Sequence, residues 1–111
     1  MRQFQTNVLD FKFVYEKSFA TEPFECAWAS EALFFIRIEE ISGEGAALTA
    51  IAQISVDGIH WIDEGSSLGP LSNHGDYFLR LKHFGGFLRL RCSVSGKDPK
   101  IQVTNNLVLK E

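Results

Sequence analysis

The stretch Gln53-Ile-Ser-Val-Asp-Gly-Ile-His-Trp61 decides the fold class of this chain. Polar and apolar side chains alternate from Gln53 to Val56, which is the period of a β-strand with one buried face. The Asp57-Gly58 pair then ends the alternation. Such a pair signals a β-hairpin, because glycine adopts positive φ at little cost and aspartate tolerates it better than most residues. The stretch predicts an antiparallel, all-β protein and points to no reaction.

Short apolar runs separated by turn residues continue along the rest of the chain. They recur about every ten residues with a period of two, as in sandwiches and barrels. The expected strands cover residues 11–19, 24–28, 32–41, 47–56, 59–63, 77–84, 87–95 and 100–109. Residues 42–45 and 96–99 are expected to be turns, with 47–56 returning antiparallel to the strand before it. We expect a two-sheet antiparallel jelly-roll or Greek-key sandwich of about eight strands.

Length and composition fit one globular domain spanning residues 1–111. The chain is 45% hydrophobic and 23% charged, and no window approaches the ~18 consecutive apolar residues of a membrane span. The N-terminal residues lack the apolar core of a secretory signal. Cys26 and Cys92 each lie on the apolar phase of a strand, so we expect reduced, buried thiols, with a disulfide between them as the alternative.

The charges are unevenly distributed along the sequence. Residues 1–64 carry 4 basic and 11 acidic side chains, whereas residues 65–111 carry 7 basic and 3 acidic ones. This asymmetry indicates a charged partner or a head-to-tail contact between subunits. The acidic isoelectric point of about 5.6 argues against nucleic-acid binding.

The residues that most often carry chemistry are scattered. His60, His74 and His83 lie on different expected elements, and none has a second metal ligand at a suitable spacing. The sequence contains no Gly-x-Ser-x-Gly elbow and no phosphate-binding glycine loop. We therefore predict no enzyme, no cofactor and no metal. An enzyme would need a cleft that holds two histidines, or one histidine with Asp63 or Glu64.

A basic stripe is the best-defined candidate interaction surface. Residues 77–84 and 87–95 are expected to pair as a hairpin through Gly85-Gly86, with aromatic and basic side chains on one face. The stripe comprises Phe78, Arg80, Lys82, Phe84, Phe87, Arg89 and Arg91. Two interpretations of this stripe are open. In the first, the stripe binds an acidic surface of another subunit. In the second, it is a solvent-exposed charge ladder whose cations are balanced by Glu39, Glu40 or Asp63 on neighbouring strands.

The N-terminal region offers a second interaction element. Residues 1–10 alternate in their own right, and such an arm can add a strand to the open sheet edge of a neighbouring subunit. The next aromatic residues, Phe11, Phe13, Tyr15 and Phe19, share one strand face and are expected in the core.

The pattern Gln53-x-Ser55-x-Asp57-Gly58-x-x-Trp61, followed by Phe87-Leu-Arg89-Leu-Arg91, resembles two kinds of β-sandwich. One is the discoidin-like (coagulation factor type C) module, which binds carbohydrate and lipid. The other is a set of small phage virion and tail-associated proteins, which fits the size and divided charge better. The resemblance covers roughly residues 47–110. It implies that Asp57, Gly58 and Trp61 shape a hairpin and its packing.

Together these features predict a non-enzymatic structural or adaptor subunit of a phage-like virion, tail or related particle. It is expected in the cytoplasm or in the virion, away from membranes, and to act through protein contacts that include self-association. The alternative is a carbohydrate- or ligand-binding jelly-roll module. Its candidate contacts are Trp28, Trp61 and His74, together with the loop of residues 64–75.

Overall fold

A computed structural model describes residues 4–82 and 84–111, and every regular element in these ranges is a β-strand. The strands are β1 (Phe4–Tyr15), β2 (Phe19–Ala20), β3 (Phe24–Glu25), β4 (Glu31–Ser55), β5 (Ile62–Leu71), β6 (Gly75–Lys82) and β7 (Phe87–Lys110). No helix that could cross a membrane occurs in the described ranges. All pairings between strands are antiparallel, as predicted.

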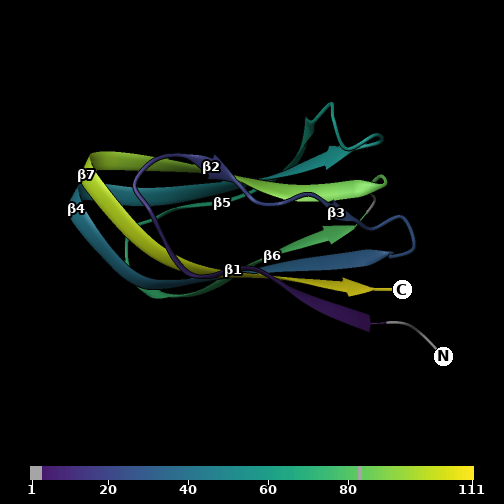
Figure 1. Ribbon diagram of the computed structural model, residues 1–111, viewed down its shortest axis with the longest axis horizontal. Helices are drawn as coiled ribbons and strands as arrows, with labels where there is room; N and C mark the ends of the chain where they lie inside the picture. Colours follow the sequence, from purple (N-terminus) through teal and green to yellow (C-terminus); the bar gives the residue numbers. More distant parts are fainter. Residues whose placement is uncertain (1–3, 83) are drawn as a thin grey trace.

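Two long strands, β4 and β7, build both layers of the molecule. Residues 31–42 of β4 pair with residues 100–110 of β7, and residues 47–55 of β4 pair with residues 87–95 of β7. The two strands therefore bend side by side and cross together from one layer to the other. The bend lies at the left of Figure 1, and the C-terminus and the start of β1 lie at the opposite end.

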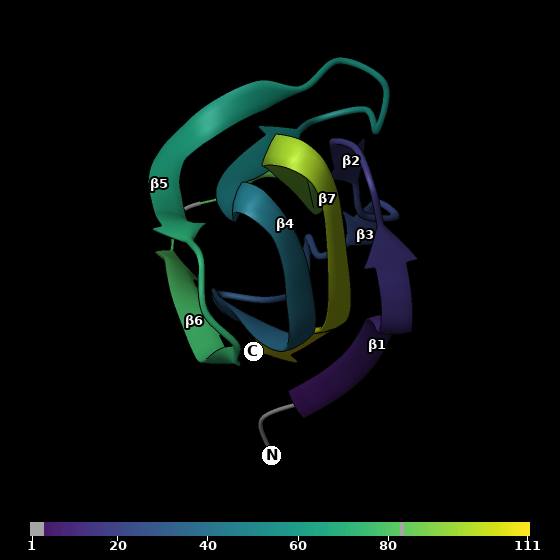
Figure 2. The same cartoon turned by 90° about the vertical axis from the view of Figure 1, so that its left-hand side faces the viewer.

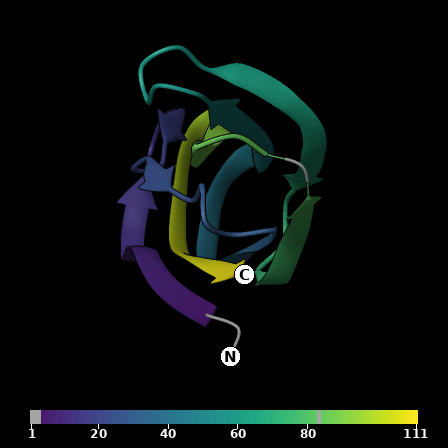
Figure 3. The ribbon, with the colours of Figure 1, turned by 90° about the vertical axis from the view of Figure 1, so that its right-hand side faces the viewer.

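Each layer is an antiparallel sheet with strands at four neighbouring positions. Sheet I contains β1, the second half of β7, the first half of β4 and β6, in that order. Sheet II contains β2 with β3, the first half of β7, the second half of β4 and β5. Seen along the long axis, β5 and β6 lie on one side and β1, β2 and β3 on the other (Figures 2 and 3). This is the strand order of a jelly roll, which confirms the predicted sandwich.

The two predicted glycine-rich turns are bends within strands. Residues 47–56 do not return antiparallel to residues 32–41, because both segments belong to β4 and lie in different sheets. Gly43 has φ +112, and a Cβ there would lie 2.9 Å from the carbonyl oxygen of Asp98. Gly96 has φ +113, and its Cβ would lie 2.7 Å from Cα of Ala46. The strands pass each other at the bend too closely for side chains at these positions.

The core between the sheets is apolar. Its fully buried side chains alternate along β4 and β7 and include Phe34, Ile36, Ile38, Leu48, Leu88, Leu90, Ile101, Leu107 and Leu109. Cys26 and Cys92 are free thiols buried in this core, as predicted. Burial raises the pKa of each thiol to about 12.

The aromatic run of the N-terminal strand is only partly in the core. Tyr15 and Phe19 pack against it, with their rings stacked at 3.4 Å. The prediction was wrong for Phe11 and Phe13, which are exposed. The register of β1 against β7 shifts twice between Val8 and Phe13, and these irregularities break the alternation that the prediction assumed.

Candidate functional site: the outer face of sheet I

The outer face of sheet I carries apolar side chains on all four strands. Its residues align in rows of cross-strand neighbours, because the registers of β1, β7, β4 and β6 match. The first row is Phe4, Lys110, Glu31 and Lys82; the second is Thr6, Val108, Leu33 and Arg80; the third is Val8, Asn106, Phe35 and Phe78. Apolar residues thus occupy the middle of the face, and three cations lie in its first two rows.

Four of these apolar side chains are strongly exposed. Phe35 is 41% exposed, Phe78 49%, Val8 61% and Phe4 66%. The rings of Phe35 and Phe78, on neighbouring strands, lie 6.4 Å apart between centroids. An antiparallel sheet with one free face normally presents polar residues to water, and a contiguous apolar patch marks an interaction site. We therefore take this face as the candidate functional site.

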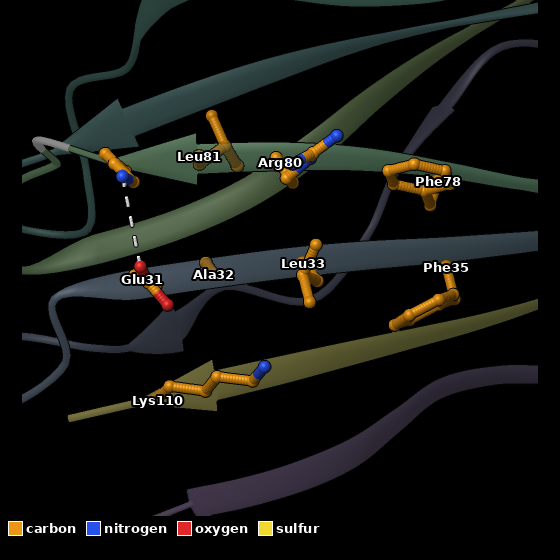
Figure 4. A pocket seen from close by; sticks show the side chains of 9 residues that line it. Glu31, Ala32, Leu33, Phe35, Phe78, Arg80, Leu81 and Lys110 are labelled. Atoms are coloured by element: carbon orange, nitrogen blue, oxygen red, sulfur yellow. Dashed lines mark ion pairs between the residues drawn. The ribbon is translucent and has the colours of Figure 1, made fainter.

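A shallow depression of about 480 Å³ lies on this face, between the ends of β4, β6 and β7. Figure 4 shows Phe35 and Phe78 together at one end of it, on neighbouring strands, with Arg80 next to Phe78. The guanidinium of Arg80 lies 5.5 Å from the centroid of the Phe78 ring. At the end of the strands, Nζ of Lys82 lies 4.0 Å from the carboxylate of Glu31. The lining of the depression therefore combines apolar side chains with three cations and one carboxylate.

The outer face of sheet II is built differently, because its polar side chains bind one another. Nε of Arg89 donates to Oε1 of Gln53 at 2.8 Å, and Nε2 of Gln53 donates to Oδ1 of Asp63 at 2.9 Å. The Arg89 guanidinium also lies over the ring of Trp61. Desolvation, followed by the nearby charge of Arg91, lowers the pKa of Arg89.

The predicted basic stripe is divided between the two sheets. Phe78, Arg80 and Lys82 lie on the outer face of sheet I, as part of the candidate site. Phe87, Arg89 and Arg91 lie on β7 where it belongs to sheet II, and Phe84 packs against the core. The predicted hairpin between residues 77–84 and 87–95 is wrong, because the chain at Gly85-Gly86 crosses between layers.

The charge asymmetry of the sequence does not produce two oppositely charged ends. β4 comes from the acidic half of the chain, and it pairs along its length with β7 from the basic half. Glu44 consequently lies opposite Lys97, and Glu31 lies opposite both Lys82 and Lys110. Opposite charges are interleaved in space, so the charge pattern gives no support to a head-to-tail contact.

The three candidate ligand residues of the alternative prediction are not brought together. His74 precedes Gly75, which pairs with Ile38 near the bend. Trp61 precedes Ile62, which pairs with Ile54 at the other end of the sandwich, where its ring is covered by Arg89. Trp28 is half-buried against the core.

The two described histidines, His60 and His74, also lie apart. His60 is exposed and held by Asp57, with 2.8 Å between Nδ1 and Oδ2. His74 lies near the bend, and His83 lies outside the described residues. Among the residues that the structure describes, no group of three or more His, Cys, Asp or Glu side chains could hold a metal ion.

Polar side chains of the Gln53–Trp61 stretch stabilise the hairpin between β4 and β5 through hydrogen bonds. The Ser55 hydroxyl accepts hydrogen bonds from the backbone N–H groups of Asp57 and Gly58. Oδ1 of Asp57 accepts from the N–H groups of Ile59 and His60. Hydrogen bonds from His60 above all, and then from Ile59 and Ser55, hold the pKa of Asp57 well below its usual range. These residues shape the hairpin, as the resemblance implied.

Leu33 and Phe35, which line the depression, were not predicted from the sequence, and neither was Val108, which lies beside Leu33 but is only 8% exposed. A signal was present, since Ala32-Leu-Phe-Phe-Ile36 and Leu107-Val-Leu109 are continuous apolar runs without alternation. Such runs are typical of strands that are covered on both faces. In sheet I one of these faces is covered by the core, and the other is open.

The sequence matches no protein-family model and no curated protein. The structure is similar to that of the SPBc2 prophage-derived protein YomS, with a TM-score of 0.68 and 12% identity, over 100% of this chain and 96% of the other. What they share is the fold. A structure of infectious bursal disease virus, Gx strain, gives a TM-score of 0.55 at 12% identity, over 98% of this chain and 32% of that chain. The discoidin-like resemblance gains no support from these neighbours.

Proposed function

We propose that this chain is a non-enzymatic structural or adaptor subunit of a phage-like virion, tail or related assembly, and that it binds a protein partner through the outer face of sheet I. The observation that carries the proposal is the pair Phe35 and Phe78, exposed side by side on the neighbouring strands β4 and β6 of this face. Complete burial of a phenylalanine side chain stabilises an interface by about 1.5–3 kcal/mol.

The make-up of the face favours a protein as the partner. Protein interfaces combine an apolar centre, enriched in aromatic residues and arginine, with a polar rim. Here Phe35 and Phe78 lie side by side, Arg80 packs on Phe78, and Lys82 and Lys110 lie toward the strand ends. We expect the partner to present apolar side chains surrounded by carboxylates.

The prophage origin of YomS supports the phage setting of the proposal, because the likeness in fold covers nearly the whole of both chains. The polar groups of sheet II give a matched comparison within the same molecule. Arg89, Gln53 and Asp63 bind one another, so that face has less to gain from a partner.

Particles produced by the genome that encodes this chain provide the test. The chain is followed by immunoblot through a density gradient of purified particles, as wild type, Phe78→Glu and Ser93→Glu. Ser93 is an exposed residue of β7 in sheet II and serves as the control. We expect wild type and the control in the particle fraction, and at least about a tenfold loss of Phe78→Glu, since a carboxylate in a buried apolar interface costs several kcal/mol. Absence of the wild-type chain from particles, or equal amounts of all three proteins, contradicts the proposal.

A further inference from the structure

β1 forms one edge of sheet I. Among the described residues it pairs with β7 alone, so the backbone N–H and C=O groups along its other side face outward. An exposed edge of this kind is a template for another strand, and proteins usually protect it with charged residues, prolines, bulges or short strand length. The opposite edge of sheet I, β6, carries Asp76, Arg80 and Lys82 as charged protection.

The N-terminal half of β1 lacks these protections. The segment Phe4-Gln-Thr-Asn-Val-Leu9 contains no charge, no proline and no glycine, and residues 4–8 pair with β7 in unbroken register. Protection begins only after it: the register shifts follow Val8, Asp10 and Lys12 bring charges, and Lys12 has φ +50. Phe4 and Val8 moreover expose most of their side chains on the outer face.

We infer that this edge segment pairs antiparallel with the same segment of a second copy of the chain, across a two-fold axis at Thr6. In that register Thr6 lies opposite Thr6 of the second copy, Gln5 lies opposite its Asn7, and Phe4 lies opposite its Val8. Apolar residues thus meet apolar residues and amides meet amides, with no like charges opposed. A two-fold contact requires such self-complementarity.

The pairing joins sheet I of the two copies into one sheet. The outer faces then form one surface across the axis, because Val8 lies in the row of Phe35 and Phe78, and Phe4 of the second copy lies opposite Val8. The inference rests on the proposed function and names one of its partners, a second copy of this chain. The face itself stays available for another component of the particle.

A charge swap at Thr6 tests the register. Thr6 is exposed, so Thr6→Lys and Thr6→Glu are expected to leave thermal unfolding unchanged. By size exclusion with light scattering, we expect the wild type to reach twice the monomer mass as its concentration rises. Each single variant raises the dissociation constant at least about tenfold, because two like charges meet on the axis. An equimolar mixture of Thr6→Lys and Thr6→Glu restores the dimer. Ser93→Lys is the control and dimerises as wild type.

The outcomes separate this inference from the proposed function. A wild-type monomer at all concentrations, a dimer that Thr6→Lys does not weaken, or a mixture that fails to dimerise overturns the edge pairing. A dimer that is broken by Phe78→Glu but not by Thr6→Lys also overturns it, because the copies then meet through the face. None of these results changes the expectation that Phe78→Glu is lost from particles, which is the readout for the proposed function alone.

Discussion

The guanidinium of Arg89 lies 4.3 Å from the centroid of the Trp61 ring, while its Nε donates to Gln53. Arg89 belongs to β7, Gln53 to β4, and Trp61 directly precedes β5. One side chain therefore links three neighbouring segments of sheet II. Gln53 is only 8% exposed, so its amide depends on protein partners in place of water.

Truncation of Arg89 is expected to destabilise the protein. Arg89→Ala removes the cation–π contact with Trp61 and leaves the Gln53 oxygen without its donor, which together reduce the free energy of unfolding by about 1–3 kcal/mol. Urea denaturation measures this loss. Arg91→Ala is the control, because Arg91 is exposed two residues further along β7; it is expected to stay within about 0.5 kcal/mol of wild type. Equal losses in the two variants would show that the contacts of Arg89 do not matter.

The bend between the layers is expected to reject a side chain at Gly96. Gly96→Ala combines a left-handed φ with a Cβ 2.7 Å from backbone atoms of Ala46, so we predict a loss of about 3 kcal/mol or more. Gly45→Ala is the matched variant. Its φ is +69 and no atom lies within 4 Å of its Cβ, so only the cost of the left-handed conformation, about 1 kcal/mol, is expected. Thermal unfolding of both variants checks the difference, and a smaller loss at Gly96 than at Gly45 contradicts it.

Asp57 is expected to make the fold sensitive to acid. Its pKa is lowered in the folded state, chiefly by the hydrogen bond with the His60 side chain. The stability that it contributes is therefore present above the unfolded pKa of about 3.9 and is lost as the pH falls through the folded value. Between pH 5 and pH 2 the melting temperature of wild type should fall more steeply than that of Asp57→Asn. Glu22→Gln, at an exposed carboxylate, should keep the wild-type slope; parallel curves for wild type and Asp57→Asn would refute this role.

The two thiols are expected to be inert in the folded protein. Burial raises the pKa of Cys26 and Cys92 to about 12, and both side chains are inaccessible, so almost no reactive thiolate is present at pH 8. Labelling with a chromogenic disulfide should be slow in buffer and rapid in denaturant. Ser93→Cys supplies an exposed thiol for comparison and should react at once. Rapid labelling of the native wild type would contradict the buried positions.

Most local elements of the fold could be predicted from the sequence, because strand period and turn chemistry are short-range properties. The hairpin at Asp57-Gly58 is an example, since Ser55, Asp57 and Gly58 make its hydrogen bonds within four residues. The predicted loop of residues 64–75 was wrong, because residues 62–71 form β5 and pair with β4 despite their glycines, serines and proline. The bends at residues 42–45 and 96–99 could not be distinguished from turns. Glycine is common in both bends and turns. Whether the chain bends or turns at these residues depends on the pairing between β4 and β7, which are distant in sequence.

The candidate site was predictable only in part, for the same reason. Alternation correctly placed Phe78, Arg80 and Lys82 on one strand face. The predicted neighbouring strand, residues 87–95, was wrong, because Gly85-Gly86 connects two layers where a tight turn was expected. Phe35 belongs to the site because it pairs with Phe78, and this pairing joins two strands that are far apart in sequence. Local sequence patterns therefore could not predict it. Local patterns thus fixed which way side chains point, and only the register fixed what lies beside them.

Because β4 and β7 pass through both layers, the two layers are expected to unfold together. Neither layer holds an independent set of strands, so neither is a separate cooperative unit. Slow hydrogen exchange in the centres of both layers should accordingly report one and the same global opening. Folding must bring residues 31–55 and 87–110 together across the intervening chain before either layer exists, a topology of high contact order that sets a slow folding rate.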